Sequence, residues 1–295
     1  STVMNPYQLP DHFLESLLQE DSPCGDATTF ALGIGQQPGH LVFRARQEMV
    51  LCGSEEARRM GELRGLLAVG PLRESGSRLK AGEEILRLNG NAASLHVVWK
   101  TAQTLMEYLS GIASSVADIV AAAQRGNPES SVVCTRKNFP GTKAAAIKAV
   151  LCGGASPHRL SLSETLLIFP EHRVFLDGKT PASTMERLRR RWPERAIVVE
   201  VDSASEARRW IDVAVDILQL EKISVETLAE IAAYAAATRQ PTKIAAAGGI
   251  NAGNAEAYAR AGARILVTSA PYFAQPRDVA VTLANGFHSL IEQSP

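Results

Sequence analysis

The sequence predicts an α/β fold, a closed or nearly closed β/α barrel preceded by a smaller α+β domain. From about residue 130 onward, short β-rich apolar runs alternate with helical patterns, which is the order of β/α units around a parallel sheet. Six such runs can be counted, with turn residues at their ends, and this number favours a barrel over an open sheet. The first 110 residues lack the alternation, which indicates a separate domain.

The barrel strands are predicted from apolar runs bounded by Gly, Pro, Asn or Asp. These runs lie at 131–135, 165–169, 196–201, 215–220, 243–250 and 264–270. Between them, apolar residues recur at helical spacing. Ser203 stands three residues before Glu206, and Asn251 precedes another helical segment, so both are predicted helix N-caps.

Residues 1–110 are predicted to form an α+β domain. An amphipathic helix at 11–20 is followed by apolar runs that are separated by Gly and Asn turns. A long helical pattern at 101–124 would carry the chain into the barrel domain, residues 111–275. Residues 276–295 are expected to form a C-terminal helix that packs back on the N-terminal domain.

Charge and composition exclude several classes of function. The chain has 31 Lys plus Arg and 31 Asp plus Glu, so no global field exists to hold nucleic acid or an anionic membrane. No apolar run approaches the roughly 18 residues of a membrane span, and the first residues show no signal-peptide pattern. We therefore expect a cytoplasmic protein with neither nucleic acid nor membrane as a partner. The four scattered cysteines are interpreted as reduced, mostly buried thiols.

A local cluster of cations contrasts with this neutral background. Residues 135–159 contain no carboxylate and six positive or protonatable side chains, namely Arg136, Lys137, Lys143, Lys148, His158 and Arg159. Arg136 and Lys137 directly follow a predicted strand, where barrel enzymes carry their reacting groups. Adjacent cations at such a place indicate a small anionic ligand. For Lys143 and Lys148, the pattern favours solvated cations on a helix.

Two further groups are predicted at the same end of the barrel. Glu200 and Glu221 end neighbouring predicted strands and could hold Mg²⁺ or the hydroxyl groups of a sugar. Gly248 and Gly249 lie between a strand and a helical pattern near the end of the repeat, where barrels bind phosphate through backbone N–H groups. A plain tight turn is the alternative for this glycine pair. Ser269, in the run "VTSAP" one unit later, is assigned to the same phosphate site.

The run "TRKNFPGTKAAAIKAVLCGGASPHRLSLSETLLIF" resembles the quinolinate phosphoribosyltransferase (nicotinate-nucleotide pyrophosphorylase) family, whose pattern reads TRK, PG, K-x-AV, GG, HR and L. Further matches are "GDATT" at 25–29, "LSGIASS" at 109–115 and "VEVDS" at 199–203, so the resemblance spans nearly the whole chain. The runs "TRKNFPGTKA", "SETLLIFPEHR" and "LVTSAPY" look like the ModD branch of this family, which is associated with molybdenum transport.

The resemblance implies an incomplete α/β barrel with an N-terminal α+β domain. It also implies a homodimer, or a larger assembly, in which the N-terminal domain of one subunit covers the barrel mouth of the other. The implied activity is that of a glycosyltransferase (a pentosyltransferase) that moves phosphoribosyl from phosphoribosyl pyrophosphate to a ring nitrogen of a heteroaromatic, carboxylated acceptor, with Mg²⁺.

The resemblance also implies a role for each candidate residue. Arg136, His158 and Arg159 would hold an acidic substrate, and Lys137 would face the pyrophosphate. Glu200 and Glu221 would hold ribose or metal and assist bond breaking. The 5′-phosphate and neighbouring phosphate groups would be bound by Gly248, Gly249, Ser269 and Lys143.

The chain departs from the family pattern on the acceptor side. Lys100 stands where the family has an arginine that reaches over from the neighbouring subunit, and Phe169 stands where it has a lysine. Leaving a buried carboxylate without its charged partner costs roughly 3–5 kcal/mol. We therefore expect Lys100 and Phe169 to contact an acceptor that is less anionic or more apolar than quinolinate. Two alternatives stay open, a true quinolinate phosphoribosyltransferase in NAD biosynthesis and a non-catalytic oxyanion- or metabolite-binding protein.

Overall fold

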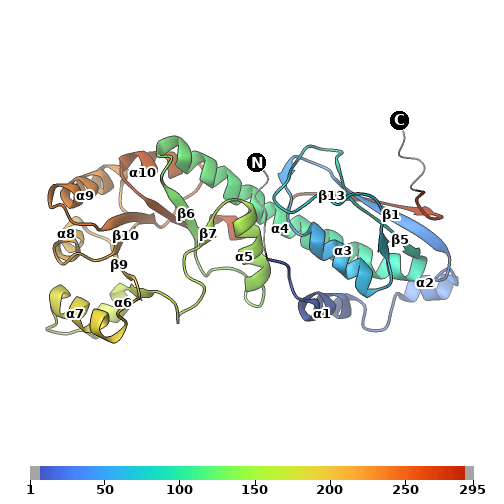
Figure 1. The fold of residues 1–295 in the computed structure, drawn as a ribbon, viewed down its shortest axis with the longest axis horizontal. Coiled ribbons are helices and arrows are strands. Elements are labelled where there is room, and N and C mark those ends of the chain that lie inside the picture. Colours follow the sequence, from blue (N-terminus) through green and yellow to red (C-terminus); the bar gives the residue numbers. More distant parts are fainter. Residues whose placement is uncertain (1–6, 290–295) are drawn as a thin grey trace. The chain divides into compact units, whose positions relative to one another are not determined.

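The computed structural model describes residues 7–289, which divide into two compact units (Figure 1). Within the described residues, the first unit comprises 7–114, 140–153 and 273–289. The second unit comprises 115–139 and 154–272. The boundary falls inside helix α4 (Ala92–Gly126), so this helix contributes residues to both units.

The second unit is built on a seven-stranded parallel sheet with the order β7-β6-β12-β11-β10-β9-β8. Its strands are β6 (Ser131–Cys134), β7 (Ser156–Pro157), β8 (Leu166–Ile168), β9 (Ile197–Val201), β10 (Ile217–Glu221), β11 (Lys243–Ala247) and β12 (Ile265–Thr268). β7 and β8 are the two edges of this order, so the sheet does not close on itself. This confirms the predicted incomplete α/β barrel.

All six predicted strands form, and β7 is a seventh. β7 has only two residues, Ser156 and Pro157, which is too short for an apolar pattern to show it. Among the longer strands, β9 is apolar on both faces except at Glu200, as a parallel strand covered on both sides requires. The helices of this unit are α6 (Pro170–Arg173), α7 (Pro181–Arg191), α8 (Ala204–Asp212), α9 (Val225–Ala237) and α10 (Ala255–Ala261), followed by the 3₁₀ turn η1 (Ala270–Phe273).

One of the two predicted helix caps is confirmed. The side chain of Ser203 accepts a hydrogen bond from the backbone N–H of Glu206 and caps α8. Asn251 does not cap α10, because that helix starts at Ala255 and the residue before it is Asn254. The Asn251 side chain instead accepts a hydrogen bond from the backbone N–H of Gly253 at 2.8 Å, which shapes the turn after β11.

The first unit has the predicted α+β character. Its antiparallel sheet has the order β13-β1-β5-β3 and consists of β1 (Pro38–Ala45), β3 (Leu67–Ala68), β5 (Glu84–Asn91) and β13 (Val279–Asn285). A second pair is formed by β2 (Met49–Val50) and β4 (Arg78–Leu79). The helices are α1 (Asp11–Asp21), α2 (Ala27–Leu32), α3 (Ser54–Leu63), the first part of α4, and α5 (Lys143–Cys152).

The predicted C-terminal helix is wrong for residues 279–285, which form β13. This strand pairs antiparallel with β1 along its whole length, from Val279 opposite Ala45 to Asn285 opposite Gly39. The run "VAVTLAN" is rich in β-branched residues, which favour a strand over a helix. Residues 290–295, the end of the predicted helix, lie outside the described residues.

Helix α4 is long and apolar enough to cross a membrane by length and composition alone, so the expectation that no segment approaches such a span is wrong. However, 56% of its most apolar 18-residue window is buried inside the structure. Met106, Ala113 and Val116 are among its fully buried side chains. The apolar side chains of α4 therefore supply protein core, as in a soluble enzyme fold.

Lys148 in α5 was expected to be a solvated cation, and this expectation is wrong. Its side chain is 1% exposed, and its Nζ lies 3.0 Å from Glu55 Oε1 and 2.7 Å from Glu56 Oε2, both carboxylates of α3. Lys148 lies on the buried side of α5 with Ala145, Ala149 and Cys152, whereas the exposed residues of this helix are Lys143 and Ala144 at its start. The three charges instead form a buried ion cluster within the first unit.

Candidate active site at the open end of the barrel

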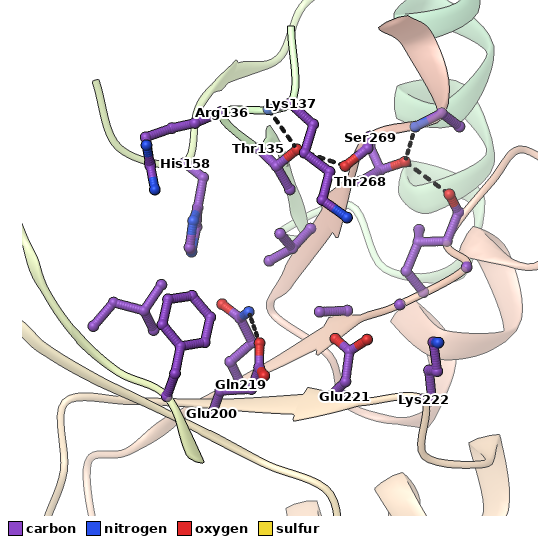
Figure 2. A pocket seen from close by; sticks show the side chains of 18 of the residues that line it. Thr135, Arg136, Lys137, His158, Glu200, Gln219, Glu221, Lys222, Thr268 and Ser269 are labelled. Carbon is purple, nitrogen blue, oxygen red and sulfur yellow. Dashed lines mark hydrogen bonds between the residues drawn. The ribbon is translucent and has the colours of Figure 1, made fainter. Parts of the chain in front are cut away.

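A cavity of about 830 Å³ lies at the carboxyl ends of the parallel strands (Figure 2). Residues from all seven strands, or from the loops directly after them, line it. Ten of the twelve predicted site residues are among them, namely Arg136, Lys137, His158, Arg159, Phe169, Glu200, Glu221, Gly248, Gly249 and Ser269. The parallel sheet thus gathers residues that are up to 133 positions apart in the sequence.

The loop after β6 supplies one cationic wall. β6 ends at Cys134, so Arg136 and Lys137 follow it directly. The backbone N–H of Lys137 donates to Thr135 Oγ1 at 3.3 Å, and that oxygen is 2.5 Å from Ser269 Oγ after β12. The ends of two neighbouring strands are therefore tied together, and Figure 2 shows the Lys137 side chain extending from them into the cavity.

The loop after β7 adds His158 and Arg159. The backbone N–H of His158 donates to the carbonyl of Cys134 at 2.8 Å, which continues the pairing of β7 with β6. Burial lowers the pKa of His158, and the neighbouring charges of Arg159 and Arg136 lower it further. The neutral imidazole is therefore the favoured form at neutral pH. Arg159 is only 6% exposed, and its Nη1 donates to the carbonyl of Thr165.

The opposite wall carries carboxylates. Glu200 on β9 and Glu221 at the end of β10 extend toward the cavity from the side that faces Lys137 (Figure 2). Gln219 lies opposite Glu200 in the β9–β10 register, and its Nε2 donates to Glu200 Oε2 at 3.1 Å. Burial raises the pKa of Glu200, and the like charge of Glu221 raises it further. The negative charges of Glu200 and Glu221 therefore repel each other in this part of the cavity.

The raised pKa of Glu200 predicts a pH-dependent effect on stability. Because the folded protein holds the Glu200 proton more tightly than the unfolded chain does, stability falls as pH rises from the ordinary carboxyl range through the raised pKa. Glu200→Gln removes this loss, so we expect its thermal midpoint to exceed that of the unchanged protein at pH 7. The difference should shrink toward pH 4. Scanning calorimetry between pH 4 and 8 measures both values.

The exposed Glu194 in the same unit offers a matched control. Glu194→Gln removes the same charge from the surface and should leave the midpoint nearly unchanged at every pH. Equal shifts for both variants would show that net charge, rather than the confined position of Glu200, causes the effect.

The turn after β11 is shaped by two glycines in the left-handed region. Gly248 has φ +84° and Gly249 has φ +77°. A Cβ on Gly248 would lie 2.6 Å from Lys222 Cγ and 2.7 Å from Glu221 Oε1, whereas a Cβ on Gly249 would have nothing within 4 Å. The turn therefore brings bare backbone against the end of β10. Helix α10 starts only at Ala255, so the expectation that a helix begins at this turn is wrong.

Two residues that line the cavity, Lys222 and Gln219, were not predicted from the sequence as site residues. Lys222 lines the cavity with a left-handed backbone (φ +52°), held by its N–H donating to Ala247 O at 2.9 Å. Gln219 lines it from the buried interior of β10. The only signals were a cation next to Glu221 and a single amide within the apolar run "ILQLE". Neither signal is specific without the neighbouring strands.

Lys100 and Lys143 are not among the residues that line the cavity. Both belong to the first unit, Lys100 as an exposed residue of α4 and Lys143 as the first residue of α5. The Lys100 Nζ lies 4.8 Å from the ring centroid of Trp99. Their expected contacts with substrate stay predictions.

The carboxylates of the cavity are compatible with an Mg²⁺ ion that also binds oxygens of a substrate. Among the described residues, no group of three or more His, Cys, Asp or Glu side chains could hold a metal ion alone. Mg²⁺ commonly uses one or two carboxylates, and water or substrate phosphate oxygens complete its shell. Glu200 and Glu221 supply such a pair. Burial and, after it, the charge of Glu221 raise the pKa of Glu200, and a divalent cation between the two carboxylates would relieve both effects.

The fold and the cavity define a protein class by architecture, an incomplete α/β barrel with a charged cavity at the carboxyl ends of its strands. The family model "Quinolinate phosphoribosyl transferase, C-terminal domain" matches residues 112–282, and the corresponding N-terminal domain model matches residues 26–110. The chain belongs to the quinolinate phosphoribosyl transferase family, and it is a phosphoribosyltransferase by class.

Relatives that match over most of their length support this assignment. The chain is 42% identical over 258 residues to "Putative pyrophosphorylase ModD" of Rhodobacter capsulatus, covering 88% of this chain and 99% of that protein. It is 38% identical over 271 residues to the protein of the same name in Escherichia coli O157:H7, covering 92% and 95%. The crystal structure of NadC from Streptococcus pyogenes matches with a TM-score of 0.86 at 24% identity, over 95% of this chain and 99% of that one. The predicted family, branch and fold are confirmed.

Proposed function

We propose that this chain transfers phosphoribosyl from phosphoribosyl pyrophosphate to a ring nitrogen of a heteroaromatic acid. The observation that carries the proposal is the arrangement of opposite charges across one cavity. Lys137, which lies across the cavity from the carboxylates, and Lys222, which follows Glu221, can meet the phosphates of the donor, and Glu200 and Glu221 can meet its ribose. A single ribose that carries a 5′-phosphate and a pyrophosphate would therefore find complementary groups on both walls.

The reaction exchanges one bond for another. The lone pair of the acceptor nitrogen forms a bond to the anomeric carbon of the ribose, while the bond from that carbon to the pyrophosphate oxygen breaks. Pyrophosphate leaves with the electron pair of the broken bond. Positive charge develops on the ribose, and Glu200 and Glu221 stabilise it. Lys137 stabilises the growing negative charge on the leaving group.

Glu200 and Glu221 would also hold Mg²⁺ together with oxygens of the donor. Bound there, the ion supplies further neutralisation of the leaving pyrophosphate. This role agrees with the paired carboxylates of the site and with the expected need for Mg²⁺.

The acceptor side of the cavity combines two guanidinium groups with apolar surface. Arg136 and Arg159 can bind a carboxylate. Phe169, which stacks on His172 at a centroid distance of 5.8 Å, and Leu167 supply apolar surface against which a heteroaromatic ring can lie. This combination favours an acceptor with fewer carboxylates than quinolinate.

Removing the Lys137 charge tests the donor site. Lys137→Met is expected to weaken phosphoribosyl pyrophosphate binding by about 10- to 100-fold, because a charged hydrogen bond contributes roughly 1.5–3 kcal/mol. Titration calorimetry with the donor and Mg²⁺ gives the affinity. Lys179→Met is the matched control, since Lys179 is exposed in the same unit and does not line the cavity.

Turnover is tested by pyrophosphate release with a panel of heteroaromatic acids that includes quinolinate and nicotinate. No binding of phosphoribosyl pyrophosphate to the unchanged protein would overturn the proposed function. Donor binding without release for any acceptor would favour a binding protein over an enzyme. Quinolinate as the best acceptor would instead assign the chain to NAD biosynthesis.

Three further parts of the proposal rest on the resemblance to the quinolinate phosphoribosyltransferase family. They are a homodimer or larger assembly in which Lys100 reaches the partner's cavity, a cytoplasmic location, and a link to molybdenum transport. Light scattering on the purified protein measures the mass of the assembly. A monomer at micromolar concentration would count against the shared cavity.

A further inference from the structure

Gln219 is a buried amide whose oxygen completes no hydrogen bond within the described residues. The residue is 4% exposed, lies in the middle of β10 and lines the cavity. Among the described residues, none completes a hydrogen bond to its Oε1, although that atom is shielded from solvent. A buried acceptor without a donor is destabilising. A ligand in the cavity can supply the missing donor.

Glu200 determines which atom of the Gln219 amide is without a hydrogen bond. Gln219 Nε2 donates to Glu200 Oε2 at 3.1 Å. An ionised carboxylate has no hydrogen to donate, so the amide cannot turn its oxygen toward Glu200 without losing this bond. Oε1 is therefore held on the side of the amide away from Glu200, and in Figure 2 this side is directed toward His158 and the cavity.

His158 does not remove the need for a donor from the ligand. Its imidazole is favoured in the neutral form, which has one N–H and one acceptor nitrogen. An interaction with the Gln219 side chain partly opposes the lowering of the His158 pKa, so the imidazole can act on this amide. When the His158 N–H turns toward Gln219 Oε1, the second ring nitrogen of His158 becomes the remaining acceptor. In either arrangement, this wall presents one hydrogen-bond acceptor more than its own donors can satisfy.

We propose that Gln219 determines specificity by accepting a hydrogen bond, directly or through His158, from an N–H group of the heteroaromatic acceptor. The preferred acceptors are then rings that carry a carboxylate for the neighbouring arginines together with a ring N–H or an amino substituent. This inference rests on the proposed function, because it assigns the substrate class of the same cavity.

Matched pairs of acceptors test the inference on the unchanged protein. The first pair is nicotinate against its 6-amino derivative. The second pair is 1-methylimidazole-4-carboxylate against imidazole-4-carboxylate, which differ in one ring N–H. We expect kcat/KM, measured by pyrophosphate release, to be about tenfold higher for at least one N–H-bearing member, because a site built to hydrogen-bond a donor rejects the analogue without it. No preference in either pair overturns the inference.

The Gln219→Met variant removes the acceptor and keeps the length of the side chain. We expect the preference within each pair to fall to about twofold or less. Phosphoribosyl pyrophosphate affinity should change much less than it does in Lys137→Met. A purely structural role for Gln219 would lower kcat/KM for both members of a pair equally and leave their ratio unchanged, which would overturn the inference.

The two proposals fail in different measurements. Absence of phosphoribosyl pyrophosphate binding to the unchanged protein counts against the transferase function. Normal donor binding and turnover, with no advantage for N–H-bearing acceptors, counts only against the role of Gln219. If Gln219→Met does not fold, the matched pairs on the unchanged protein still decide the inference.

Discussion

Gly248→Ala is expected to weaken phosphoribosyl pyrophosphate binding by about 10- to 100-fold. The loss of one charged hydrogen bond, which contributes roughly 1.5–3 kcal/mol, is enough for this effect. The new Cβ would meet Glu221 Oε1 at 2.7 Å and Lys222 Cγ at 2.6 Å. Both atoms belong to side chains that can turn aside. The protein would therefore still fold, but the Glu221 carboxylate and the Lys222 stem would leave the positions that line the cavity.

Gly249→Ala is the matched control for this prediction. Both glycines have left-handed φ values, so an alanine at either position incurs about 1–2 kcal/mol of backbone strain. However, a Cβ on Gly249 would have nothing within 4 Å. We expect similar losses of thermal stability in the two variants and a large loss of donor affinity in Gly248→Ala alone. Equal affinities would show that backbone strain, rather than displacement of Glu221, controls this turn.

The parallel sheet could be predicted from sequence because its signal is local. Runs such as 196–201 and 215–220 are mostly apolar, and each β/α unit ends in turn residues. Once the strands are parallel, their carboxyl ends must lie at one edge, so the prediction that Arg136 and Glu200 share a cavity needed no contact information. Two-residue β7 was missed because its strand character depends on pairing with β6. The β-branched residues of β13 are a local strand signal, which its pairing with β1 bears out.

The sequence also could not predict the chemistry of Gln219 or the burial of Lys148. The physical reason differs from the one that applies to β7. Each depends on a partner supplied by a distant segment, Glu200 for Gln219 and the carboxylates of α3 for Lys148. An isolated lysine in a helix is most often solvated, since its desolvation is costly. Only the position of Glu55 and Glu56, more than 90 residues earlier in the chain, reverses that expectation.

The buried cluster around Lys148 leads to the second large prediction. Burial alone would lower the pKa of Lys148, but the charges of Glu56 and Glu55 outweigh it and raise the pKa, so the ammonium stays charged. Burial raises the pKa of Glu56 in spite of the attraction of Lys148. Lys148→Met would leave Glu56, which is 0% exposed, without its counter-charge. We expect a loss of about 3–5 kcal/mol in the free energy of unfolding.

Glu56→Gln in the Lys148→Met background separates charge from packing. The amide replaces the carboxylate with little change in volume and carries no charge, so the double variant should regain most of the lost stability. Glu55 needs no rescue, because it is partly exposed and also accepts hydrogen bonds from the backbone N–H of Ser75 and from the hydroxyl of Ser54. Urea unfolding of the three proteins gives the comparison. If the double variant is as unstable as Lys148→Met alone, the lysine stabilises this unit through the packing of its alkyl chain, and the uncompensated charge of Glu56 is not the cause of the loss.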